Sequence, residues 1–159
     1  QRQMCIRDSA NLGGLYRMNG HPDLAREHME KSISLLDQFN LLHINDSIPQ
    51  IANYAMFLTE QQEPERGISE LQKLSGIIKE YHSDHCLDYA KVQETLGTIY
   101  LMTANLPQAK THFKRAFKIY EKIWADEPEM IEAKYQEIQE LYPQIGFSIG
   151  KTLSGLLTK

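Results

Sequence analysis

Four residues within a span of five have the chemistry of metal ligands: His82, Asp84, His85 and Cys86. Imidazole, carboxylate and thiolate groups bind zinc, but zinc sites usually combine two ligand blocks at a recognisable spacing, and this sequence has no second block. A linker between two helices explains the same residues, with Asp88 as the N-cap of the helix that follows. We therefore expect no metal site and no cofactor.

Other candidates for catalysis are equally weak. Pairing Cys86 as a nucleophile with a histidine requires unrelated loops, and no serine lies in a Gly-x-Ser-x-Gly turn. The segment from Gly146 to Thr152 ends like a phosphate-binding loop, but it has three rather than four residues between its glycines and a helical context. Glu137 and Glu140 lie in an acid-rich helical segment, which is typical of a solvated face. We expect that the chain is not an enzyme.

Composition sets broad limits on what the chain can be. It has 159 residues, of which 42% are hydrophobic and 24% charged, and this indicates one folded domain or one short repeat array. A net charge of −4 argues against nucleic-acid binding. No apolar run approaches the roughly 20 residues of a membrane helix, so we expect no membrane span. Cys5 and Cys86 are too few and too distant for a disulfide framework, which favours a cytoplasmic location.

A residue pattern recurs at a fixed interval of about 42 residues. Leu12-Gly13-x-x-Tyr16 reappears as Leu96-Gly97-x-x-Tyr100, and halfway between them Tyr54 begins the same order of large and small residues. Further small residues follow in the same register, at Ala25, Gly67 and Ala109. This agreement indicates three repeat units, which by register span about 6–47, 48–89 and 90–131.

Each unit predicts two antiparallel helices separated by a turn. The turns contain Gly20-His21-Pro22, Gln62-Glu63-Pro64 and Ala104-Asn105-Leu106-Pro107, because proline is tolerated in the first turn of a helix. We expect the small residues to let the two helices of a pair approach closely, with Gly13, Ala55 and Gly97 facing Ala25, Gly67 and Ala109. The fold class is therefore an all-α solenoid of antiparallel helix pairs. Residues 129–159 predict a degenerate fourth repeat or C-terminal capping helices, with a first helix over 129–142 and an amphipathic segment over 147–157.

The signature Leu-Gly-x-x-Tyr, followed by small residues in the second helix, resembles the tetratricopeptide repeat (TPR). The repeat length of about 42 residues and the linker Asp84-His85-Cys86-Leu87-Asp88-Tyr89-Ala90 are similar to those of the kinesin-light-chain-like subtype, with Cys86 in place of a proline. The resemblance covers residues 10–124 well. It implies a superhelix whose concave face is lined by the first helix of each pair, and a non-catalytic scaffold that binds a protein or peptide ligand.

The resemblance and the repeat offset together predict which residues bind that ligand. Asparagine and threonine can hydrogen-bond to a peptide main chain, methionine adapts to varied apolar groups, and two charged residues would lie at the rim. The predicted peptide-binding residues of the concave face are Asn11, Met18, Asn53, Met56, Glu60, Lys91, Glu94, Thr95, Thr98 and Met102.

One predicted helix has a strongly basic face. Lys110, Lys114, Lys118 and Lys122 recur every four residues. A solvated outer face is the simpler interpretation, because the chain as a whole is acidic and no exposed aromatic residues alternate with the lysines. A patch for an anion or an acidic partner is the alternative.

The amino end requires separate treatment. Residues 1–9 resemble a translated sequencing adapter, so we expect a non-native leader there, three repeats over 10–128, and further native sequence upstream. Two other functions stay open: the C-terminal peptide-sensing domain of a bacterial transcription regulator, and an accessory domain of a larger signalling enzyme. A homo-oligomer is also possible, since a second chain or an upstream repeat could cover the stacking face at 10–16.

Overall fold

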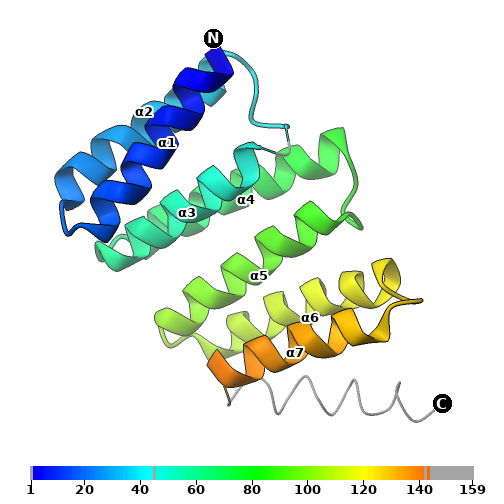
Figure 1. Cartoon of the computed structure of the whole chain (residues 1–159). Coiled ribbons are helices and arrows are strands. Elements are labelled where there is room, and N and C mark those ends of the chain that lie inside the picture. The colour runs from blue at the N-terminus through cyan, green and yellow to red at the C-terminus, as the bar shows by residue number, and fades with distance from the viewer. Residues whose placement is uncertain (1, 45, 142, 144–159) are drawn as a thin grey trace. The chain divides into compact units, whose positions relative to one another are not determined.

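The computed structural model describes residues 2–44, 46–141 and 143, and over these residues it contains seven α-helices and no strand (Figure 1). The helices are α1 (Arg2–Met18), α2 (Pro22–Gln38), α3 (Ser47–Glu60), α4 (Pro64–Tyr81), α5 (Leu87–Met102), α6 (Leu106–Ile123) and α7 (Pro128–Leu141). They fall into two compact units. The first unit is Gln1–Ser83, with α1 to α4, and the second is Asp84–Lys159, with α5 to α7.

The three predicted turns have the same backbone geometry. Gly20, Gln62 and Ala104, which share one register position in the three repeats, have positive φ values of 74°, 65° and 58°. Each is followed by a residue whose N–H donates to the carbonyl five positions earlier, which is the Schellman motif that ends a helix. These bonds are His21 to Tyr16 (2.9 Å), Glu63 to Leu58 (2.8 Å) and Asn105 to Tyr100 (2.7 Å). The all-α prediction and the positions of its turns are confirmed.

The expected close approach of small residues is present in the first unit. A Cβ atom added to Gly67 would lie 2.6 Å from the carbonyl oxygen of Ala55, so α3 and α4 meet backbone to backbone at this point. A Cβ added to Gly13 would lie 2.6 Å from Cγ of Met29 and 3.3 Å from the carbonyl oxygen of Ala25. Both expected pairs therefore face each other, and neither glycine can gain a side chain without moving its neighbour.

In the second unit the contact of Gly97 corresponds to the contact of Gly13 with Met29, because Phe113 and Met29 share one register position. A Cβ added to Gly97 would lie 2.9 Å from the ring of Phe113, whereas the expected neighbour was Ala109. The ring fills the space because Phe113 follows Ala109 by one helical turn and is fully buried. Gly97 therefore leaves room for an aromatic ring, as Gly13 leaves room for the side chain of Met29.

The core of each unit is formed by the faces that the repeat pattern makes apolar. In the first unit a buried cluster joins α2 to α3, and Tyr16 and Ile33 pack against it. Its members are Ala25, Met29, Tyr54, Phe57 and Leu58. In the second unit the fully buried large residues include Leu96, Ile99, Phe113 and Tyr120.

The predicted N-cap of α5 is wrong. Cys86, not Asp88, occupies that position, and its Sγ accepts a hydrogen bond of 3.4 Å from the N–H of Tyr89. Asp88 lies in the first turn, where its negative charge interacts favourably with the helix dipole. A thiol is an uncommon cap, so the sequence favoured the carboxylate two residues later.

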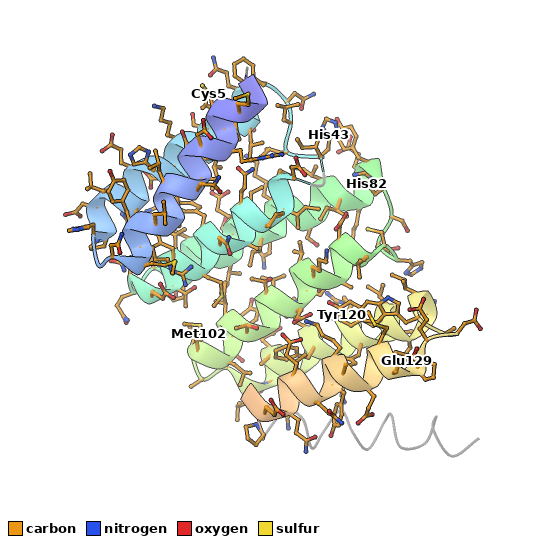
Figure 2. The ribbon with its side chains drawn as sticks, viewed as in Figure 1. Cys5, His43, His82, Met102, Tyr120 and Glu129 are labelled. Atoms are coloured by element: carbon orange, nitrogen blue, oxygen red, sulfur yellow. The ribbon has the colours of Figure 1, made fainter. Side chains whose placement is uncertain are left out.

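Two histidines hold the loop after α2. His82 was a candidate metal ligand in the sequence, whereas His43 had no predicted role. The Nε2 of His82 lies 2.8 Å from the carbonyl oxygen of His43, and the ring of His43 stacks on Tyr81 with centroids 4.7 Å apart (Figure 2). Among the described residues, no group of three or more His, Cys, Asp or Glu side chains could hold a metal ion.

Both ends of the chain bear on the sequence predictions. Residues 2–9, expected to be a leader, form the first half of α1, and Ile6 is buried. At the other end, α7 matches the expected first capping helix within one residue at each end. The amphipathic segment expected over 147–157 lies outside the described residues.

Candidate functional site

The first unit contains a hollow of about 540 Å³ bounded by α1, α2 and α3. It forms because α1 packs mainly on α2 and has little contact with α3. The lining residues come from all three helices and from the loop before α3: Arg7, Ala10, Asn11, Gly14, Arg17, Met18, Met29, Ser32, Ile33, Asp46, Pro49, Gln50 and Asn53.

Helical periodicity places four of the lining residues of α1 in one row. Arg7, Asn11, Gly14 and Met18 follow at spacings of four, three and four residues, which is the repeat of a single helix face. An added Cβ on Gly14 would have no neighbour within 4 Å, so this glycine leaves the hollow open at its middle.

Two ion pairs join α1 to the α3 side of the hollow. Arg7 lies 3.3 Å from the carboxylate of Asp46, and both side chains are well exposed. Arg17 donates to both carboxylate oxygens of Glu60, with Nε 2.8 Å from Oε2. The two arginines are ten residues apart on α1, a distance of roughly 15 Å along the helix axis. An exposed pair such as Arg7–Asp46 contributes less than about 1 kcal/mol to stability, so it can exchange for a ligand at low cost.

Two amide side chains in the hollow have no hydrogen-bond partner among the described residues. Asn11 and Asn53 are both exposed, and they occupy the same register position on α1 and α3. The neighbouring Gln50 differs, because its Oε1 accepts from the hydroxyl of Ser32 at 2.7 Å and its Nε2 donates to the carbonyl of Asp46 at 3.1 Å. Each free amide can donate two hydrogen bonds and accept two more.

Half of the predicted peptide-binding residues belong to the first unit. Asn11, Met18 and Asn53 line the hollow together. Met56 is half-buried and does not line it. Glu60 contributes through its ion pair with Arg17 rather than as a free carboxylate.

The other predicted residues lie on α5 in the second unit. Lys91 is exposed and lies 3.8 Å from Asp88. The hydroxyls of Thr95 and Thr98 donate to the α5 carbonyls of Lys91 and Glu94, at 3.0 and 3.1 Å. Met102 is 47% exposed at the end of the helix (Figure 2).

Glu94, expected at the rim of a groove, is held within the second unit. Its carboxylate accepts a hydrogen bond of 2.6 Å from the hydroxyl of Tyr120 and lies 2.8 Å from Nζ of Lys134. Burial lowers the pKa of Lys134, but its contacts with Glu94 and Glu137 outweigh burial and raise that pKa above its ordinary value. Glu94 therefore ties α5 to α6 and α7.

Sequence reasoning missed several residues of the hollow, of which Arg7, Arg17 and Gln50 carry the most chemistry. Arg7 was set aside with the expected leader, although it precedes Asn11 by one helical turn. Gln50 precedes Asn53 by three residues in the same way. Extending the row from each asparagine by one turn finds both side chains. No sequence signal pairs Arg17 with Glu60, because that contact depends on how α1 lies across α3.

The fold and the hollow define a class of protein: an all-α solenoid of helix pairs with an open, polar and apolar surface on its first helices. The sequence comparison agrees over the middle of the chain, since residues 47–122 match the model of the tetratricopeptide repeat. This part of the chain therefore consists of tetratricopeptide repeats. Repeats of this family generally serve as scaffolds for protein interaction.

A solved structure agrees with the all-α fold. The crystal structure of BtubC (BKLC) from P. vanneervenii is similar over 99% of this chain and 66% of that chain, with a TM-score of 0.74 and 15% sequence identity. This chain thus spans about two thirds of the length of that neighbour, and at this identity the likeness shows the fold. No curated protein matches the sequence significantly. None of the described helices is long and apolar enough to cross a membrane.

Proposed function

We propose that this chain is a non-catalytic scaffold module that binds an extended segment of a partner protein in the hollow of the first unit, in the cytoplasm. The observation that carries the proposal is the pair of unpartnered amides, Asn11 and Asn53, on two sides of one hollow. A peptide main chain offers alternating N–H and C=O groups, and side-chain amides match both.

The rest of the lining supports an extended peptide. Met18, Met29 and Ile33 provide an apolar surface, and methionine adapts its shape to different side chains. The separation of Arg7 and Arg17, roughly 15 Å along α1, corresponds to about four or five residues of extended chain. Amides for the main chain and adaptable apolar groups for side chains favour a protein ligand over a small metabolite.

The proposal is tested with peptides selected from a displayed library of random sequences against the whole chain. Binding of a selected peptide is measured by fluorescence anisotropy for the wild type and for Asn11→Ala with Asn53→Ala. We expect the double variant to bind about tenfold more weakly, because each lost hydrogen bond contributes about 0.5–1.5 kcal/mol. The variant should keep its helical circular dichroism, since neither amide has a partner in the described part of the fold.

The matched control is Asn19→Ala, an exposed asparagine that does not line the hollow. It should leave the affinity unchanged. If the double variant binds the selected peptides as tightly as the wild type, the hollow is not the peptide site.

A further inference from the structure

The lysines of α6 lack ionic partners, unlike most other basic residues of the described chain. Lys110, Lys114, Lys118 and Lys122, named here the lysine face, form no ion pair among the described residues. In contrast, ion pairs with carboxylates hold Arg7, Arg17, Arg26, Arg66, Lys73, Lys91 and Lys134.

The lysine face is unfavourable for the isolated helix. Like charges four residues apart on a helix repel each other, and the lysine face has three such pairs in succession. Glu121 forms no ion pair with these lysines among the described residues, and burial raises the pKa of its carboxyl. Arg115 is not part of this face, because it donates a hydrogen bond of 3.1 Å to Oε1 of the buried Gln93. The helix is held instead by its opposite side, which is buried.

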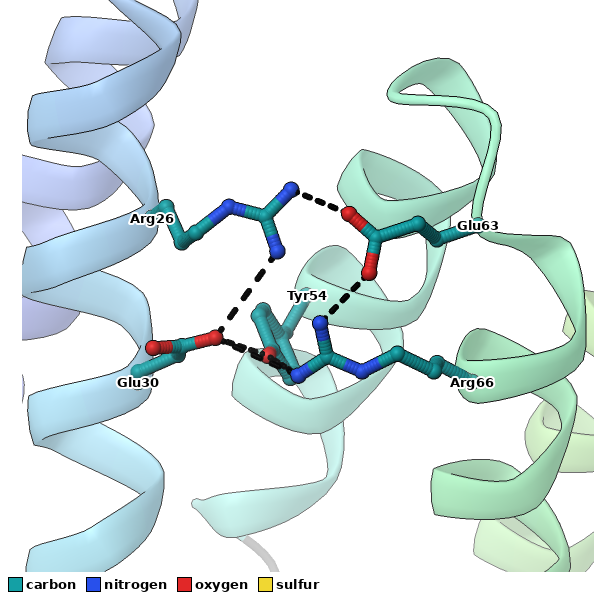
Figure 3. Close-up of polar contacts among 5 residues, drawn as sticks. All are labelled: Arg26, Glu30, Tyr54, Glu63 and Arg66. Atoms are coloured by element: carbon teal, nitrogen blue, oxygen red, sulfur yellow. Dashed lines mark hydrogen bonds and ion pairs between the residues drawn. The ribbon is translucent and has the colours of Figure 1, made fainter.

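The equivalent positions of α2 show which contacts this face of a second helix makes in the first unit. Lys110 and Lys114 occupy the register positions that Arg26 and Glu30 hold in α2, two repeats earlier. In the first unit Arg26 lies 2.6 Å from Glu63, and Glu30 lies 3.3 Å from Arg66 (Figure 3). This face of α2 thus binds the start of another helix, α4, through opposite charges. On α6 the same face has only positive charges.

The chain's own C-terminal segment does not supply the missing negative charge. Residues 144–159 contain no Asp or Glu, and they add Lys151 and Lys159. On α7, Glu137 already pairs with Lys134 at 2.9 Å. Residues 144–159 and Glu137 thus provide no free carboxylate for the lysine face.

We propose that the lysine face of α6 is a second interaction surface, which binds an acidic helix of a partner protein with carboxylates at every fourth residue. A protein ligand fits better than a nucleic acid, because the aromatic rings of Phe113, Phe117 and Tyr120 are all buried and α6 offers no exposed ring for base stacking. The net charge of −4 also opposes a long polyanion, whereas a short acidic helix meets only the basic face. The surface belongs to the second unit, whereas the hollow belongs to the first.

The test titrates the whole chain into a labelled, helix-forming peptide of alanine and glutamine with Glu at every fourth position, at low ionic strength. We expect saturable binding that weakens as salt rises. Lys114→Gln with Lys118→Gln should weaken binding by about tenfold. This variant should melt at or above the wild-type temperature, because like-charge repulsion is removed.

Two controls separate the lysine face from net charge. Lys31→Gln removes an exposed lysine of α2 and should leave the affinity unchanged. Lys114→Gln with Gln108→Lys keeps the composition but moves one charge off the row, and it should weaken binding several-fold. Equal weakening by Lys31→Gln, or no saturable binding, would overturn the proposal.

The same titration distinguishes other ligands. Tighter binding of a single-stranded oligonucleotide or of anionic lipid vesicles, without competition from the acidic peptide, would overturn the choice of a protein partner. Self-association of the chain at low salt, lost in the Lys114→Gln and Lys118→Gln variant, would assign the face to a second copy instead. Retained affinity of the Asn11→Ala and Asn53→Ala variant for the acidic peptide would show that this surface is independent of the hollow.

Discussion

The first and second units use the same repeat register for the same packing contacts. Tyr16 stacks on His28 with ring centroids 5.3 Å apart, and two repeats later Tyr100 stacks on His112 at 5.2 Å. Together with the identical turns, this contact shows that the register fixes how the two helices of a pair lie against each other. Differences between the units arise elsewhere.

The polar contacts differ between the two units. In the first unit Tyr54 of α3 donates to Glu30 of α2 at 2.8 Å, within a network of five residues that reaches α4 (Figure 3). Burial and Glu30 raise the pKa of Tyr54, while hydrogen bonds from Arg26 and Arg66 lower the pKa of Glu63. This network lies among α2, α3 and α4, so it leaves the α1 side of the hollow free.

In the second unit a tyrosine–carboxylate hydrogen bond uses a predicted binding residue of a first helix as its acceptor. Glu94 of α5 accepts from Tyr120 of α6 and pairs with Lys134 of α7. Glu94, which was predicted to bind a ligand, therefore has its carboxylate engaged by contacts within its own unit. The comparison teaches that the repeat pattern sets the packing, whereas a few polar substitutions decide whether the face of a first helix stays available.

The largest expected difference is between Gly67 of the first unit and Gly97 of the second. Gly67→Ala should destabilise the chain by about 3 kcal/mol, because the new Cβ meets the backbone of Ala55 and the two helices must separate. Gly97→Ala should cost about 1–2 kcal/mol, since the ring of Phe113 can shift slightly. Urea unfolding measures both changes.

Gly76→Ala is the matched control for these variants. Gly76 lies in α4 with open space around it, so alanine should stabilise the helix by about 0.5–1 kcal/mol. Equal costs for Gly67→Ala and Gly97→Ala would contradict the distinction between a backbone contact and a side-chain contact.

A smaller difference is expected between the two tyrosine hydrogen bonds. Tyr120→Phe should cost about 2 kcal/mol, because Tyr120 is buried and Glu94 is only 19% exposed. Tyr54→Phe should cost about 1 kcal/mol, since Glu30 is 44% exposed and keeps its arginine partners. Thermal unfolding of the two variants gives the order. The reverse order would show that the first-unit network is the more cooperative one.

The smallest expected effect is a pH dependence that arises in the second unit. Burial, followed by the nearby charge of Arg115, lowers the pKa of His112 below its ordinary value. The unfolded chain then binds a proton more readily than the folded chain, so this contribution to stability is present above the ordinary pKa of about 6.5 and is lost as the pH falls below it. Melting curves across mildly acidic pH should show a smaller decline for His112→Gln than for the wild type. An identical decline would remove His112 as the cause.

Much of the fold followed from the sequence, and less of the hollow did. The turns at Gly20, Gln62 and Ala104 were predictable because glycine, proline and register act locally. The N-cap of α5 was not, since an aspartate two residues along is the better cap by type. Among the predicted binding residues, Asn11 and Asn53 were found through their shared register, whereas the occupation of Glu94 depends on Lys134 of a helix outside the clear repeats.

By itself, the sequence determined the repeat period, the helix pairs, the family resemblance and the candidate first-helix face, because these depend on spacing along one chain. Only the tertiary structure decided which polar groups are free. Arg17 and Glu60 neutralise each other and Glu94 is bound within its own unit, while Asn11 and Asn53 stay available. The reason is physical: a hydrogen bond or ion pair between helices depends on where distant side chains meet, and a repeat pattern contains no information about that meeting point.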